Sequence, residues 1–177
     1  MTPPAAASRP LFTADEVAAR VDALAAAIAR RLPPDLLVVG ILVAAFVFTA
    51  DLVRAPGRHG AAPQVDFLRL ASYGDATSPT TPPRRIGPVP AMLAGRDVLL
   101  VDTVHDTGHT LARALQLVQA ERPRSVHTCV LVDKPARRAT TVTPDFTGFT
   151  ADGFLIGYGL DGGQGERWLP HIAVLLE

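Results

Sequence analysis

The stretch that decides the fold is Val98-Leu-Leu-Val-Asp-Thr-Val-His-Asp-Thr-Gly-His-Thr-Leu111. Its apolar start predicts a buried strand over 97–101, and the periodic apolar residues after Gly108 predict a helix over 110–120. Ligands of open α/β sheets bind beyond the carboxyl ends of the strands. A Thr-Gly turn that opens a helix also directs backbone N–H groups and the positive end of the helix dipole at one point. The segment therefore predicts a phosphate-binding turn with acids at its rim, against the alternative of a plain corner capped by an aspartate.

Outward from this segment, apolar runs alternate with helical patterns. A capping box of Thr13 and Glu16 precedes a predicted helix over 14–31, and a second helix is predicted over 45–54. Strands are predicted over 36–42, 65–72 and 126–132, with short apolar runs over 154–156 and 172–176. Residues 73–90 concentrate Pro, Ser and Thr and predict a long loop. Such alternation indicates an α/β fold with a parallel sheet covered on both faces.

Composition limits the class of protein. The chain has 177 residues, enough for one domain, which we expect over 11–177 after a loose Pro/Ala-rich tail over 1–10. Seventeen basic residues balance seventeen acidic residues, so binding of nucleic acid through phosphate contacts is not expected. The single cysteine, Cys129, fits a reducing compartment, and no apolar run is long enough to span a membrane. We expect a cytoplasmic protein with no membrane partner.

The segment over 98–111 resembles the phosphoribosyl-pyrophosphate (PRPP) signature of type I phosphoribosyltransferases, in which two acids and two apolar residues precede Asp-Thr-Gly and Thr. More narrowly, the chain resembles the hypoxanthine-guanine phosphoribosyltransferases over 40–52, 65–74, 131–138, 145–149 and 154–161, in family order. The resemblance implies a parallel sheet flanked by helices, with a small hood built from the N- and C-terminal segments. It also implies a purine-salvage glycosyltransferase that uses PRPP and a 6-oxopurine, and a homodimer or homotetramer.

The resemblance assigns roles around PRPP. Asp106 matches the general acid/base near purine N7, and the 5′-phosphate loop comprises Asp106, Thr107, Gly108, His109 and Thr110. Asp102 and Thr103 occupy the acidic pair that faces the ribose in the family.

The resemblance also assigns residues that would bind pyrophosphate, Mg²⁺ and the purine base. Val43, Ala44 and Arg167 match pyrophosphate-contacting positions, and Asp161 together with Asp102 would bind Mg²⁺. The purine would be met by Lys134, the only lysine of the chain, by Phe154, which would stack on the base, and by the backbone of Leu155. Ser72 and Tyr73 open the loop that closes over the site in the family. A lysine only donates hydrogen bonds, which favours a 6-oxo group over the 6-amino group of adenine.

Two positions depart from the family pattern. Thr103 replaces the second acid of the pair, and Leu42-Val43-Ala44 replaces Leu-Lys-Gly, a loop that often contains an unusual cis peptide in the family. These departures motivate one alternative, a non-catalytic nucleotide-binding regulatory protein on the same fold. A phosphoribosyltransferase that prefers xanthine is a second alternative, because nothing in the sequence ranks hypoxanthine, guanine and xanthine. A metal site formed by His105 and His109 is disfavoured, because Gly108 interrupts the helix between them.

Overall fold

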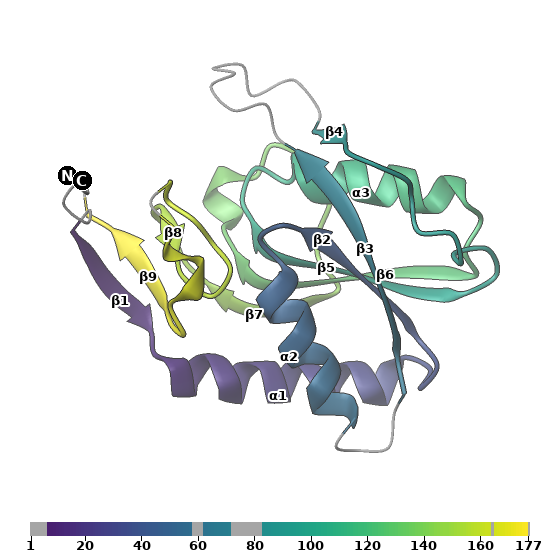
Figure 1. The fold of residues 1–177 in the computed structure, drawn as a ribbon, viewed down its shortest axis with the longest axis horizontal. Helices are drawn as coiled ribbons and strands as arrows, with labels where there is room; N and C mark the ends of the chain where they lie inside the picture. Colours follow the sequence, from purple (N-terminus) through teal and green to yellow (C-terminus); the bar gives the residue numbers. More distant parts are fainter. Residues whose placement is uncertain (1–6, 58–61, 72–82, 164, 177) are drawn as a thin grey trace.

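The core of the molecule is a six-stranded sheet in the order β4-β3-β2-β5-β6-β7 (Figure 1). The computed structural model describes residues 7–57, 62–71, 83–163 and 165–176. The strands are β2 (Leu37–Leu42), β3 (Gln64–Ala71), β4 (Arg84–Arg85), β5 (Asp97–His105), β6 (Ser125–Asp133) and β7 (Phe146–Thr150). All neighbours are parallel except β4, which pairs antiparallel with β3 at the edge. The predicted parallel sheet is confirmed.

Helices cover both faces of this sheet. On one face lie α1 (Ala14–Arg31) and α2 (Phe46–Gly57), and on the other lies α3 (His109–Ala120), as Figure 1 shows. Successive strand residues point to opposite faces. Leu99 and Val101 of β5 accordingly pack with α1 and α2, whereas Val98 and Leu100 pack with α3. The apolar runs of the sequence reflect these two separate cores.

Local signals explain where α1 begins. The side chain of Thr13 accepts a hydrogen bond from the backbone N–H of Glu16 at 3.3 Å, and a Glu16 carboxylate oxygen accepts one from the backbone N–H of Thr13 at 2.8 Å. This reciprocal capping box satisfies two helix-end donors. The predicted bounds of 14–31 match the helix that the structure contains.

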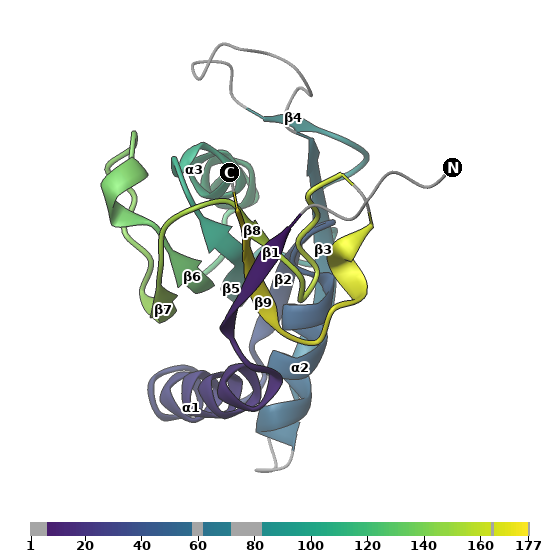
Figure 2. The same ribbon diagram turned by 90° about the vertical axis from the view of Figure 1, so that its left-hand side faces the viewer.

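A second, smaller sheet forms the hood beside the main sheet (Figure 2). It consists of β1 (Ser8–Phe12), β9 (Ile172–Leu175) and β8 (Leu155–Ile156), all antiparallel. The expected hood from the two chain ends is therefore present. Residues 8–10, which we expected in the loose tail, pair with β9, so that prediction is wrong for them; residues 1–6 lie outside the described residues. The partner that orders them is 160 or so residues away in the chain, where local patterns give no signal.

Other boundaries also differ from those expected. Strand β5 continues to His105 because Val104 and His105 pair with Val132 and Asp133 of β6. Strand β7 was not predicted, and β4 lies inside the segment over 73–90 that we expected to be a loop. The first part of that loop, with Ser72 and Tyr73, lies outside the described residues. Within the part of the chain that is described, no helix is both long and apolar enough to cross a membrane.

Candidate active site

The turn between β5 and α3 lies at the carboxyl end of the sheet. Gly108 is the N-cap of α3 and has a φ of 91°, a left-handed conformation that glycine tolerates best. A Cβ at Gly108 would also lie 2.2 Å from Oγ1 of Thr140, so the close approach of the neighbouring loop requires glycine as well. The turn borders a cavity of about 50 Å³ whose lining includes Asp102, Asp106, Thr107 and Thr110. The first N–H groups of a helix have no partner within it, and Thr110 and Leu111 of the first turn of α3 line this cavity, an arrangement suited to an anion.

Asp106 and Lys134 are brought together from β5 and β6. The Lys134 ammonium lies 3.1 Å from Oδ2 of Asp106 and donates a hydrogen bond to the Gly153 carbonyl at 2.7 Å. Lys134 is only 3% exposed, so these two oxygens take the place of water as hydrogen-bond partners of its ammonium group. The segment that carries Gly153 also carries Phe154, which is 55% exposed, and Leu155, which is buried in β8. Lys134 therefore contacts the residue that directly precedes Phe154 and Leu155, the other two residues expected to meet a purine.

Arg137 is a residue that the sequence analysis missed. Its Nε lies 3.0 Å from Oδ1 of Asp106, so cations lie near both oxygens of that carboxylate. A short 3₁₀ helix, η1 (Pro135–Arg137), places Arg137 one turn after Lys134. The sequence does contain one signal for this contact. Pro135 can begin a helical turn, and such a turn would bring Arg137, three residues after Lys134, to the same side of the chain as Lys134. The next residue, Arg138, instead pairs with Asp133 and donates to the Val142 carbonyl.

A second cavity, of about 380 Å³, lies beside the same strand end. Its walls are formed by the loop over 41–44, the end of β3, and residues Asp102, Val104, Thr110, Leu160 and Arg167. The peptide bond between Leu42 and Val43 is cis. Val43 and Ala44 both line the cavity, so the loop expected to meet pyrophosphate adjoins Asp102.

Asp102 and Thr103 have different surroundings. Asp102 lines both cavities, yet burial raises the pKa of its carboxyl to about 7, against the lowering effect of the backbone N–H groups of Thr103 and Val104. The Thr103 side chain is fully buried and donates a hydrogen bond to the Ala44 carbonyl at 3.0 Å. Thr103 lines neither cavity. Only Asp102 of this pair can reach a ligand directly.

The loop after β8 supplies a carboxylate and a cation. Oδ1 of Asp161 accepts hydrogen bonds from the N–H groups of Gly163 and Gly165, which hold the pKa of Asp161 below its usual value. Arg167, in the 3₁₀ helix η2 (Glu166–Trp168), lies 3.3 Å from Asp161 and donates to the Gly159 carbonyl at 2.6 Å. These contacts favour the ionised form of Asp161, and Arg167 is among the residues that line the cavity of about 380 Å³.

Two histidines, His105 and His109, lie next to the turn between β5 and α3. His109 begins α3 and is half-buried, whereas His105 is buried with its Nε2 3.1 Å from the Val142 carbonyl. Burial is the main cause that lowers the pKa of His105. His105, the last residue of β5, is thus held against the loop that carries Val142.

The donor set suits a hard divalent cation shared with a substrate. No ion pair in the described part of the chain includes Asp102, a buried carboxylate whose raised pKa shows that it lacks a compensating charge. Among the described residues no group of three or more protein ligands could hold a metal alone. Mg²⁺ is typically bound through one or two carboxylates plus substrate phosphates. Asp102, which lines both cavities, therefore fits Mg²⁺ that arrives with a phosphorylated substrate. Asp161 lines neither cavity and is linked to the cavity of about 380 Å³ through its ion pair with Arg167.

Comparisons with known proteins agree on one family. A model of the phosphoribosyl transferase domain matches residues 11–162. Hypoxanthine phosphoribosyltransferase from Escherichia coli K12 is 34% identical over 165 residues, which cover 91% of each chain. Hypoxanthine-guanine phosphoribosyltransferase from Bacillus subtilis is 34% identical over 140 residues, 78% of this chain and 76% of the relative. A solved structure of Trypanosoma cruzi hypoxanthine phosphoribosyl transferase has a TM-score of 0.88 and 31% identity, covering 97% of this chain and 93% of that one.

Proposed function

Since the chain belongs to the phosphoribosyltransferase family, we propose that it transfers the 5-phosphoribosyl group of PRPP to a 6-oxopurine. The products are a nucleoside 5′-monophosphate and pyrophosphate, so the reaction salvages hypoxanthine or guanine. The observation that carries this proposal is the buried contact between Lys134 and Asp106 at the end of the sheet. The contact brings a hydrogen-bond donor within 3.1 Å of a carboxylate, which supports a site where one planar base meets both groups.

The base site follows from what these two groups can do. The Lys134 ammonium donates but cannot accept, so it pairs with a 6-oxo group and opposes the 6-amino group of adenine. A buried donor that faces another donor costs about 1–3 kcal/mol. Asp106 accepts the N7 proton as N9 attacks the ribose. The exposed ring of Phe154 stacks on the base, and the backbone of Leu155 meets its exocyclic group.

The PRPP site combines the two cavities. The turn at the start of α3 holds the 5′-phosphate through its N–H groups and through the hydroxyls of Thr107 and Thr110. Pyrophosphate lies in the larger cavity, against the backbone of Val43 and Ala44 and near the Arg167 guanidinium. Displacement at the ribose leaves negative charge on pyrophosphate, and a fixed cation there stabilises the transition state.

Asp102 and Asp161 would hold Mg²⁺ with the substrate. When bound, the ion neutralises charge that develops on the leaving pyrophosphate. A cation beside Asp102 also supplies the charge that this buried carboxylate lacks. Asp161, whose carboxylate accepts hydrogen bonds from two glycine N–H groups and pairs with Arg167, would contribute a second oxygen ligand.

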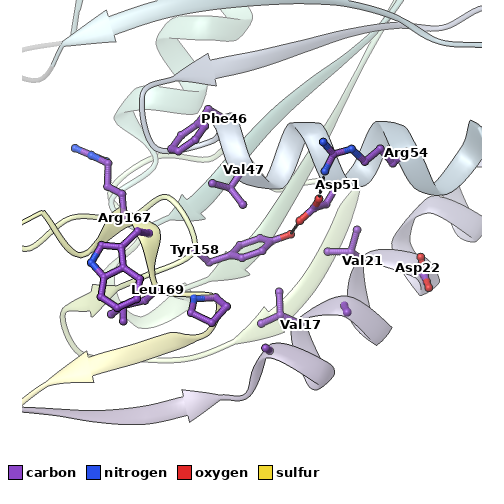
Figure 3. Close-up of a pocket in the computed structure, with 14 residues that line it drawn as sticks. Val17, Val21, Asp22, Phe46, Val47, Asp51, Arg54, Tyr158, Arg167 and Leu169 are labelled. Carbon is purple, nitrogen blue, oxygen red and sulfur yellow. Dashed lines mark hydrogen bonds and ion pairs between the residues drawn. The ribbon is translucent and has the colours of Figure 1, made fainter.

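A surface cavity supports the proposed homodimer or homotetramer. This cavity of about 570 Å³ lies between α1, α2, Tyr158 and the segment over 167–170 (Figure 3). The Tyr158 hydroxyl donates to Asp51 within it at 2.8 Å. Phe46 and Trp168, exposed by 42% and 77%, line it from α2 and η2. Apolar side chains of this size on a surface are typical of subunit contacts. Light scattering of the wild type and of Trp168→Ala measures the assembly, which the substitution should weaken.

Asp106→Asn separates the enzyme from a regulatory nucleotide-binding protein on the same fold. The amide keeps the shape of the side chain but cannot take the N7 proton, so turnover should fall by about 10²–10⁴-fold while PRPP still binds. Binding is measured by calorimetry with and without Mg²⁺, and turnover by pyrophosphate release. Wild-type protein that binds nucleotide and releases no pyrophosphate would indicate the regulatory protein, and normal turnover by Asp106→Asn would reject the role of Asp106.

A further inference from the structure

We infer that Thr103 is a positioning residue, which fixes the backbone of Ala44 at the pyrophosphate pocket and thereby sets the affinity for PRPP. The inference rests on the proposed function, because it assigns the cavity of about 380 Å³, lined by Val43, Ala44 and Asp102, to pyrophosphate. It explains why an uncharged side chain can stand at a position where the family pattern has an acid. The hydroxyl acts through the loop over 42–44 and does not touch the substrate.

The side chains of Asp102 and Thr103 point to opposite faces of the sheet, because successive residues of β5 alternate between the faces. Val98 and Leu100 pack on the α3 face, and Asp102 continues that side into the cavities. Leu99 and Val101 pack on the face of α1 and α2, and Thr103 continues that side toward the loop that leads into α2. Adjacent strand residues face opposite ways. Asp102 is therefore available to a ligand, whereas Thr103 is available to the loop.

The Ala44 carbonyl joins three segments around the cavity. It accepts the hydrogen bond from Thr103 at 3.0 Å, and it lies 2.3 Å from the point where a Cβ on Gly159 would stand. Gly159 in turn accepts from the Arg167 guanidinium at 2.6 Å and donates from its N–H to the Arg167 carbonyl at 3.0 Å. The end of β5, the loop over 42–44 and the loop that carries Arg167 are therefore packed on one carbonyl oxygen. A change at Thr103 is transmitted to both walls of the pocket.

The chemistry of the contact requires a donor at position 103. An ionised aspartate only accepts hydrogen bonds, so its oxygen would repel the Ala44 carbonyl. Thr103 donates without bringing a charge, and Val43 at the adjoining loop also carries none. The two departures from the family pattern are thus neighbours in space. Neither residue brings a charged side chain to the loop over 42–44.

Calorimetric titration with PRPP and Mg²⁺ tests the inference on the wild type, Thr103→Ser, Thr103→Val and Thr128→Val. Valine matches the shape of threonine but removes the donor, so PRPP binding would have to order the Ala44 backbone that the hydrogen bond now fixes. The free energy of one buried hydrogen bond sets this penalty at about tenfold in affinity. We expect Thr103→Val to raise the PRPP dissociation constant about tenfold and Thr103→Ser to raise it by about twofold or less. Thr128, on β6, is the matched control, because its buried hydroxyl donates a hydrogen bond to Asp145 just before β7, and neither residue lines the two cavities.

The outcomes separate this inference from the proposed function. In turnover, Thr103→Val should raise the KM for PRPP and leave the KM for the purine unchanged, a split that general loosening of the fold would not produce. Thr103→Asp should bind PRPP more weakly than the wild type, although it restores the family's acid. Equal PRPP affinity of Thr103→Val and wild type, or an equal loss in Thr128→Val, would overturn the inference. A wild type that binds PRPP but releases no pyrophosphate would reject the proposed function, while the binding constants still decide the role of Thr103.

Discussion

Replacing Asp102 with asparagine should stabilise the unliganded protein at high pH. Burial raises the pKa of this carboxyl from 3.8 to about 7, so the folded chain holds the proton more tightly than the unfolded chain. This contribution to stability is fully present below about pH 4 and is lost as the pH rises through about 7. The difference between the two pKa values corresponds to about 4 kcal/mol of unfolding free energy. Asparagine has nearly the same shape and no charge, so Asp102→Asn avoids the loss.

Urea unfolding from pH 4 to pH 8, without Mg²⁺ or PRPP, measures the effect. Comparing the variant with the wild type at each pH cancels the titration of the other groups. The two proteins should be similar near pH 4, and Asp102→Asn should become more stable by about 4 kcal/mol at pH 8. A difference in stability that does not change with pH, or a variant less stable than wild type at pH 8, would refute the reasoning. The same variant should bind PRPP and Mg²⁺ more weakly, because it lacks the Asp102 carboxylate that would hold the ion. That carboxylate lowers the stability of the unliganded protein at high pH, a cost that is common at binding sites.

Three further changes test other parts of the account. Thr13→Ala removes the cap of α1 and should lower the unfolding free energy by about 1 kcal/mol in urea, with PRPP affinity unchanged. Gly108→Ala places a Cβ against Thr140 in a left-handed backbone, so PRPP affinity should fall at least about tenfold; wild-type affinity would contradict the tight turn. Lys134→Ala should reduce the preference for hypoxanthine over adenine by about 10- to 100-fold in kcat/KM, and an unchanged preference would reject the role of Lys134.

The sequence predicted the elements whose signals are local. The capping box of Thr13 and Glu16, the apolar run before Asp102 and the glycine at position 108 each act within a few residues, and the corresponding elements form where expected. β1 and β7 were missed because each is short and is ordered by a distant partner. Phe12 of β1, for example, stacks on Phe149 of β7 with ring centroids 4.0 Å apart.

For the candidate residues, the sequence predicted their places in the fold but not their contacts. Motif spacing placed Asp102, Asp106 and Lys134 at strand ends, and the fold brings Asp106 and Lys134 within 3.1 Å. Spacing could not show that Arg137 approaches the same carboxylate, since a 3₁₀ turn decides that contact. Nor could it show that Thr103 faces the loop, because strand pairing alone fixes which residues of β5 point to which face.

Pyrophosphate release from PRPP and Mg²⁺, measured in parallel with hypoxanthine, guanine, xanthine and adenine, tests the central claim most directly. The account predicts turnover with 6-oxopurines and a rate with adenine lower by at least about tenfold, because the Lys134 ammonium opposes the 6-amino group. Turnover of adenine at the rate of hypoxanthine, or no release with any base from folded protein, would contradict it.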